Sequence, residues 1–152
     1  MKQIFCVILL FAGLSVFSQD QHASQNNLNL NQGVALSGYD PVTYLNQNKA
    51  VKGSKDLSAT DKGASYYFST AANRDEFKKN PSKYEPQYGE WCAYAMGKNG
   101  TKVEVDPETF KIIDGKLFLF YNRFFNNTLN SWNKDESNLH QQADQHWRKF
   151  TN

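Results

Sequence analysis

The stretch FKIIDGKLFLFY, residues 110–121, gives the clearest indication of local structure in the chain. Apolar and aromatic side chains dominate both halves of it, and Asp114-Gly115 lies between them. An Asp-Gly pair suits a two-residue type I′ turn, because the twist of that turn matches the twist of the strands on either side. The stretch therefore predicts an antiparallel β-hairpin with strands at residues 110–113 and 116–121.

The chain after this hairpin predicts two C-terminal helices. Apolar side chains recur between residues 122 and 150 at spacings of three and four, which places them on one helical face. The first helix would carry Phe125, Leu129 and Trp132, and the second would carry Leu139, Ala143, Trp147 and Phe150.

Two further strands are expected before the hairpin. The turn-forming sequence Gly38-Tyr39-Asp40-Pro41 precedes residues 42–45, which are read as a short strand. Residues 63–68 are read as a second strand, because their aromatic side chains favour a pleated surface. Residues 48–62 between them are polar and rich in turn-forming residues.

A helix is predicted from Ala71 to Lys79, with Ser69 or Thr70 as its N-cap, Phe77 facing inward and Pro81 ending it. The expected fold class is therefore α+β: a small antiparallel sheet with a β-hairpin, one helix after the second strand, and two C-terminal helices.

The start of the chain predicts export. Lys2 precedes the apolar run from Ile4 to Val16, which is shorter than the roughly 20 residues that span a bilayer, and Ser18 is a small residue at a suitable cleavage point. Residues 1–18 are therefore read as a signal peptide, and the mature protein as periplasmic or secreted, with no stable membrane insertion.

The rest of the chain predicts one domain. Residues 19–33 are polar, with isolated leucines, and are read as a disordered tether. Residues 34–152 are enough for a single core. The formal net charge is only +2, and this argues against nucleic acid as a partner. A small ligand or a metal ion is the expected partner, while the oligomeric state is left open.

Cys92 and Met96 form a candidate metal site. A separation of four residues puts two side chains on one side in either a helix or a strand. A thiolate and a thioether together suit a soft ion such as Cu(I), so copper is the candidate cofactor. The alternative is that both are core residues, Cys92 as a small buried hydrophobe and Met96 as a gap-filler.

Cys92 could also be a nucleophile, with His140 or His146 as base and Asp144 orienting it. Its aromatic and alanine neighbours would raise the pKa of a buried thiol, and this disfavours a thiol enzyme. A binding protein is expected rather than an enzyme.

The aromatic residues offer a third possibility, a groove for a non-metal ligand or partner. Tyr39, Asp40, Tyr44, Tyr88 and Trp91 are the candidate binding residues. The competing interpretation makes the rings core and edge aromatics whose polar tips reach water.

Several separated motifs resemble the longer, exported proteins of the YHS-domain family. They are GYDPVTY at 38–44, YFS at 67–69, NRDEF at 73–77, NPSKY at 80–84, QYGEWCA at 87–93, VDP at 105–107 and DGKL at 114–117. The resemblance implies a small α+β domain and an association with heavy metals, especially copper. Short family members resemble D-P-V-C-G-M and Y-F-C-S-x-x-C, but this chain has no cysteine at the corresponding positions, which are Thr43, Leu45, Ser69 and Asn73. Cys92 is the thiol left to take such a role.

Overall fold

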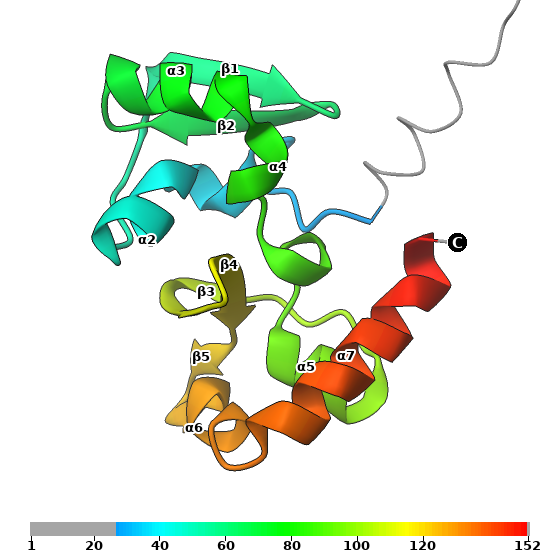
Figure 1. Ribbon diagram of the computed structural model, residues 1–152. Helices are drawn as coiled ribbons and strands as arrows, with labels where there is room; N and C mark the ends of the chain where they lie inside the picture. Colours follow the sequence, from blue (N-terminus) through cyan, green and yellow to red (C-terminus); the bar gives the residue numbers. More distant parts are fainter. Residues whose placement is uncertain (1–26, 152) are drawn as a thin grey trace, which may run out of the picture.

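The computed structural model describes residues 27–151 (Figure 1). It mixes helices with small antiparallel hairpins, so the predicted α+β class is confirmed. The predicted signal peptide, and residues 19–26 of the predicted tether, lie outside the described residues. Within residues 27–151, no helix is both long enough and apolar enough to cross a membrane.

The first half of the fold is a hairpin with a helix across it. Strands β1 (Ser54–Asp61) and β2 (Ala64–Phe68) pair antiparallel, and α3 (Ala71–Lys79) lies against them (Figure 1). The short helices η1 (Ala35–Gly38), α2 (Pro41–Gln47) and α4 (Pro81–Tyr84) complete this half. Its core contains Phe68, Phe77 and Tyr84, all buried. The predicted strand at 63–68 and the helix at 71–79 are thus confirmed, with Thr70 as the N-cap.

The second half is built around the predicted hairpin. Strands β3 (Asp106–Ile113) and β4 (Lys116–Phe120) pair antiparallel, with Ile113 opposite Lys116. Helices α6 (Thr128–Trp132) and α7 (Glu136–Thr151) are the two predicted C-terminal helices. The first begins later than expected, so the placement of Phe125 on it is wrong: Phe125 lies exposed in the turn between the short strands β5 (Asn122–Arg123) and β6 (Asn126–Asn127). Helix α7 packs along α5 (Ala93–Asn99). The approach is close because Gly97 has no side chain: a Cβ there would lie 2.5 Å from the Leu139 carbonyl oxygen.

The two halves meet through a third cluster of buried side chains. Leu36 and Tyr44 from the first half pack with Leu117 and Leu119 from β4. The 3₁₀ turn η2 (Gln87–Glu90) also joins the halves, between α4 and α5 (Figure 1).

The expected strand at residues 42–45 is wrong, because these residues lie in α2. The carboxylate of Asp40 accepts a hydrogen bond from the Val42 amide at 2.9 Å, and Pro41 occupies the first helical turn. An Asp N-cap followed by proline is a helix start, which outweighs the β-preference of Val42 and Thr43. The polar, turn-rich interpretation of 48–62 missed β1, whose side chains are mostly exposed.

Residues 27–33, the described part of the predicted tether, pack against the domain. Leu28 and Leu30 pack against the first core cluster, and the Asn29 amide donates to the Gly89 carbonyl at 2.8 Å. The isolated leucines of residues 27–33 therefore anchor this segment to the domain.

Candidate functional site

The turn η2 directs one carboxylate into the protein. Tyr88, Gly89 and Glu90 all have positive φ, at 56°, 60° and 71°. This conformation is uncommon for residues other than glycine. Gly89 is needed for a second reason, since a Cβ there would lie 2.6 Å from the Asn27 carbonyl oxygen and 2.8 Å from the Trp147 ring. The turn places the Glu90 side chain between the two halves.

Glu90 is buried and only half satisfied. The residue is 2% exposed, and its Oε2 accepts a hydrogen bond from the Leu36 amide at 2.6 Å. Its Oε1 is also buried and has no hydrogen-bond partner among the described residues. An unpartnered buried polar atom destabilises a fold by about 1–3 kcal/mol, so its presence calls for an explanation.

Burial, together with the nearby charge of Glu85, raises the pKa of Glu90 to about 8, although the Leu36 hydrogen bond acts in the opposite direction. A carboxyl with that pKa is mostly protonated at neutral pH. It can then donate a hydrogen bond, and it can become an anion when a cation approaches.

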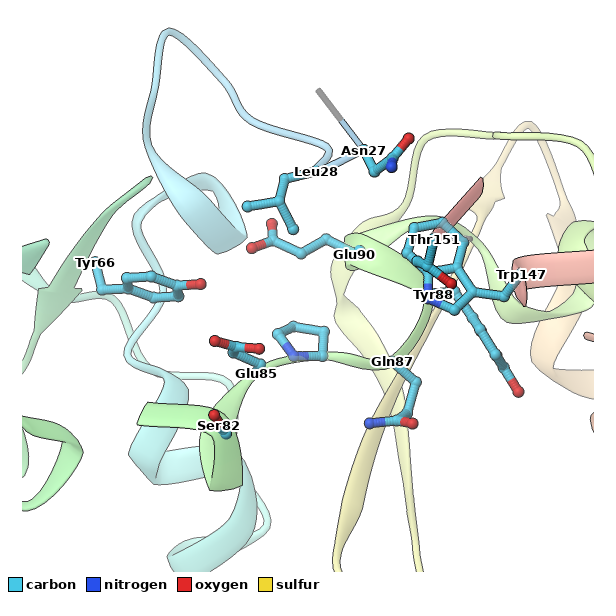
Figure 2. A pocket seen from close by; sticks show the side chains of 12 residues that line it. Asn27, Leu28, Tyr66, Ser82, Glu85, Gln87, Tyr88, Glu90, Trp147 and Thr151 are labelled. Atoms are coloured by element: carbon cyan, nitrogen blue, oxygen red, sulfur yellow. The ribbon is translucent and has the colours of Figure 1, made fainter. Parts of the chain in front are cut away.

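A cavity of about 280 Å³ lies beside Glu90. Its walls include Leu28 from the N-terminal segment, Tyr66 from β2, Tyr88 from η2 and Trp147 from α7. Figure 2 shows the Tyr66 hydroxyl and the Glu90 carboxylate pointing toward each other from opposite sides of the space. Burial and the charge of Glu90 both raise the pKa of Tyr66, so its hydroxyl stays protonated.

A second carboxylate lies at the edge of the cavity. Glu85 accepts two hydrogen bonds from Lys62 Nζ, at 2.8 and 3.0 Å. Asp61 is a neighbour of Glu85, and burial together with a hydrogen bond to Glu85 raises the pKa of Asp61. Glu85 therefore has a cationic partner, and Glu90 has none in the described part of the chain.

The predicted metal ligands, Cys92 and Met96, are both fully buried. Cys92 Sγ accepts a hydrogen bond from the Tyr121 amide at 3.3 Å and lies 3.4 Å from Thr128 Oγ1. Met96 belongs to the core cluster that contains Trp132. In residues 27–151 no three or more His, Cys, Asp or Glu side chains are grouped so that they could hold a metal ion.

The residues proposed to activate Cys92 have other contacts. His146 Nδ1 lies 2.7 Å from the Met96 carbonyl oxygen, and the His140 ring packs on Phe118. Asp144 accepts a hydrogen bond from the Tyr88 hydroxyl at 2.8 Å. The contacts of Cys92 Sγ described above include none of these three residues.

The five candidate residues of the aromatic groove are distributed over the fold. Tyr39 and Tyr44 belong to the cluster at β3–β4, where their hydroxyls donate to Glu108 and to the Pro107 carbonyl, each at 2.8 Å. Tyr88 and Trp91 belong to the cluster around α5 and α7. Trp91 Nε1 donates to the Asn27 carbonyl at 2.8 Å. Of these four rings, Tyr88 lines the cavity beside Glu90.

Asp40, the fifth candidate, makes hydrogen bonds that stabilise the fold. Its carboxylate is buried and accepts hydrogen bonds from the Ser69 amide and hydroxyl, at 2.8 and 2.7 Å, and from Asn73 Nδ2 at 2.7 Å, in addition to the Val42 amide. These bonds tie α2 to the start of α3.

Sequence reasoning missed Glu90. The available signal was Gly89-Glu90 inside an aromatic segment. A glycine next to a charged residue indicates a turn, and the charged side chain could then point inward. That signal reveals neither the burial of Glu90 nor the cavity that it shares with the distant Leu28, Tyr66 and Trp147.

No family model, no curated protein and no solved structure matches this chain. The resemblance to the YHS-domain family therefore stays a prediction from sequence motifs.

Proposed function

We propose that this protein is a small exported binding domain and that its ligand occupies the cavity beside Glu90. The observation that carries the proposal is Glu90 Oε1, a buried carboxylate oxygen without a partner in the described chain, beside a space of about 280 Å³. A ligand that supplied the missing hydrogen bond would remove the penalty of leaving that oxygen unsatisfied.

The character of the walls supports the same function. Small-molecule sites are concave and mostly apolar, with a few placed polar groups. Here Leu28, Tyr66, Tyr88 and Trp147 supply the apolar surface, and a larger set of polar residues lines the rest of the cavity: Asn27, Ser82, Glu85, Gln87, Glu90 and Thr151. The volume is at the small end for such sites, so the ligand would be a compact molecule or one part of a larger molecule.

A fragment titration followed by NMR tests the proposal. The panel would contain small cationic, neutral and anionic aromatic compounds. We expect at least one compound to shift the amide signals of Tyr66 and Glu90 and the indole signal of Trp147. Ser82→Trp should block this binding, because Ser82 is an exposed residue on the cavity wall (Figure 2). Binding that misses the cavity signals, or that persists in Ser82→Trp, would refute the site.

Soft-metal binding through Cys92 is the second candidate. Cys92 lines a separate cavity of about 360 Å³ with Tyr94, Tyr121 and Thr128, although its side chain is fully buried. An anaerobic Cu(I) titration against a competing chelator tests it. Stoichiometric binding that Cys92→Ser abolishes and Met96→Leu weakens would support this candidate.

A further inference from the structure

The cavity beside Glu90 is lined by two carboxylates, three aromatic rings and several neutral residues. Its polar wall holds the carboxylates of Glu85 and Glu90, and its rings come from Tyr66, Tyr88 and Trp147. Among the described residues that line it, none is a lysine or an arginine. Such a surface offers an anion no cationic partner, whereas aromatic faces attract a cation.

Glu85 and Glu104 each have a cationic partner, whereas Glu90 has none in the described part of the chain. Lys62 neutralises Glu85 at the edge of the cavity. On the other side, Glu90 also borders a cavity of about 260 Å³, where Arg123 lies 3.8 Å from Glu104. The groups that face or influence Glu90 are thus Glu85, Asp61, Lys62, Tyr44, Tyr66, Glu104 and Arg123.

We infer that the cavity binds a small organic cation that carries N–H donors on a flat apolar body, and that the Glu90 carboxylate, whose Oε1 is covered in the empty site, turns toward the ligand so that an N–H group donates to Oε1. The inference rests on the proposed function, and it adds the chemical class of the ligand. An amidinium or a primary ammonium group donates the hydrogen bond that Glu90 Oε1 lacks, and its positive charge pairs with the ionised Glu90 carboxylate. The flat body packs between Tyr66 and Trp147, which lie on opposite sides of the space (Figure 2).

Binding is coupled to the release of one proton. At neutral pH the empty site holds Glu90 as the neutral acid, because its pKa is about 8. The cation favours the carboxylate, so the carboxyl proton passes to bulk water as the ion pair forms. The apparent affinity for a cation therefore rises with pH until Glu90 is ionised without a ligand.

Three compounds of nearly equal shape test the inference: benzamidinium, benzamide and benzoate. They differ mainly in charge, and benzamidinium keeps its charge up to pH 9. We expect benzamidinium to bind at pH 9 at least about tenfold more tightly than the other two. Between pH 9 and pH 6 its affinity should fall by roughly two orders of magnitude, since a group of pKa about 8 is only about 1% ionised at pH 6.

Glu90→Gln provides the matched variant, because glutamine keeps the shape and one acceptor oxygen but cannot ionise. It should lose benzamidinium affinity by about tenfold or more at pH 9 and lose the pH dependence, while benzamide binding stays the same. Glu104→Gln removes an equal charge from the exposed side and should leave all three affinities within about twofold. If Glu90→Gln does not fold, the pH profile of the unchanged chain tests the same point.

Two results would overturn the inference. Benzamide or benzoate binding as tightly as benzamidinium at pH 9, with cavity signals shifting, would exclude the cation but keep the cavity as a ligand site. No binding by any of the three would also exclude the cation, and the wider fragment panel then decides whether the cavity binds ligands at all.

Discussion

The backbone amide of Leu36 donates to Glu90 Oε2 at 2.6 Å, although the two residues lie 54 positions apart. This bond joins η1 of the first half to η2 between the halves, and it fixes one oxygen of the carboxylate while the other stays without a described partner. The same side chain therefore contributes to the connection between the halves and to the candidate ligand site.

Glu90 should make the protein less stable as the pH rises. Its pKa is about 8 in the folded protein and about 4.5 when exposed, so the folded state holds a proton between these values that the unfolded state has lost. This contribution to stability is complete below pH 4.5 and is lost as the pH rises toward 8, with a slope of up to about 1.4 kcal/mol per pH unit.

Urea unfolding at several pH values measures this slope. Glu90→Gln should flatten the profile across pH 5–8 and be more stable than the unchanged chain at pH 8. An unaltered slope in the variant would show that other groups cause the pH dependence.

Asp40→Ala should strongly destabilise the fold. The change removes the N-cap of α2 and leaves the Ser69 amide and Asn73 Nδ2 without their buried acceptor. A lost cap is worth about 1 kcal/mol and each unsatisfied donor about 1–3 kcal/mol, so we expect a loss of about 3 kcal/mol or more in the free energy of unfolding. Chemical denaturation measures it.

The control for this variant is Asp75→Ala. Asp75 is exposed and pairs with its neighbour Arg74. That change should alter the free energy of unfolding by less than about 1 kcal/mol. Equal effects of the two variants would contradict a structural role for Asp40.

Replacing Phe124-Phe125 by Asn-Gly should stabilise the protein. These residues form the two-residue turn between β5 and β6, both have positive φ, and both rings are exposed. Left-handed backbone conformation destabilises an ordinary residue by about 1–2 kcal/mol, while Asn-Gly suits a type I′ turn. We expect a gain of at least about 1 kcal/mol in the free energy of unfolding.

Thermal and urea unfolding of the Asn-Gly variant check this gain, and Phe124→Ala with Phe125→Ala separates the two causes. Alanine removes the exposed rings but keeps the strain, so it should gain much less. A double alanine variant as stable as the Asn-Gly variant would mean that turn conformation is not the reason.

Cys92 should react with iodoacetamide only when the fold opens. Its side chain is fully buried and its sulfur contacts the Tyr121 amide and Thr128. Alkylation at pH 8 should therefore be on the order of a hundredfold slower in the native protein than in strong urea, because the thiol waits for local unfolding. Mass spectrometry of the peptide that contains Cys92 measures the rate. Equal native and unfolded rates would show an accessible thiol and favour the metal-binding candidate.

Local patterns predicted much of the fold. The Asp114-Gly115 turn specifies the β3–β4 hairpin, and the spacing of Leu139, Ala143 and Trp147 specifies one face of α7. Each of these signals depends on residues within a few positions of one another. The strand prediction at residues 42–45 failed because Asp40 and Pro41, also local, form a helix start that was read as a turn.

The candidate site depends on residues that are far apart in the sequence. The sequence by itself determined that Glu90 follows a glycine in a segment of aromatic residues. Only the tertiary structure brought Leu28, Tyr66 and Trp147 to the cavity that Glu90 borders and left Oε1 without a partner in the described chain. The physical reason is that turns and helix faces arise from neighbouring residues, whereas burial, and the pKa that follows from it, arises from side chains that are far apart in the chain.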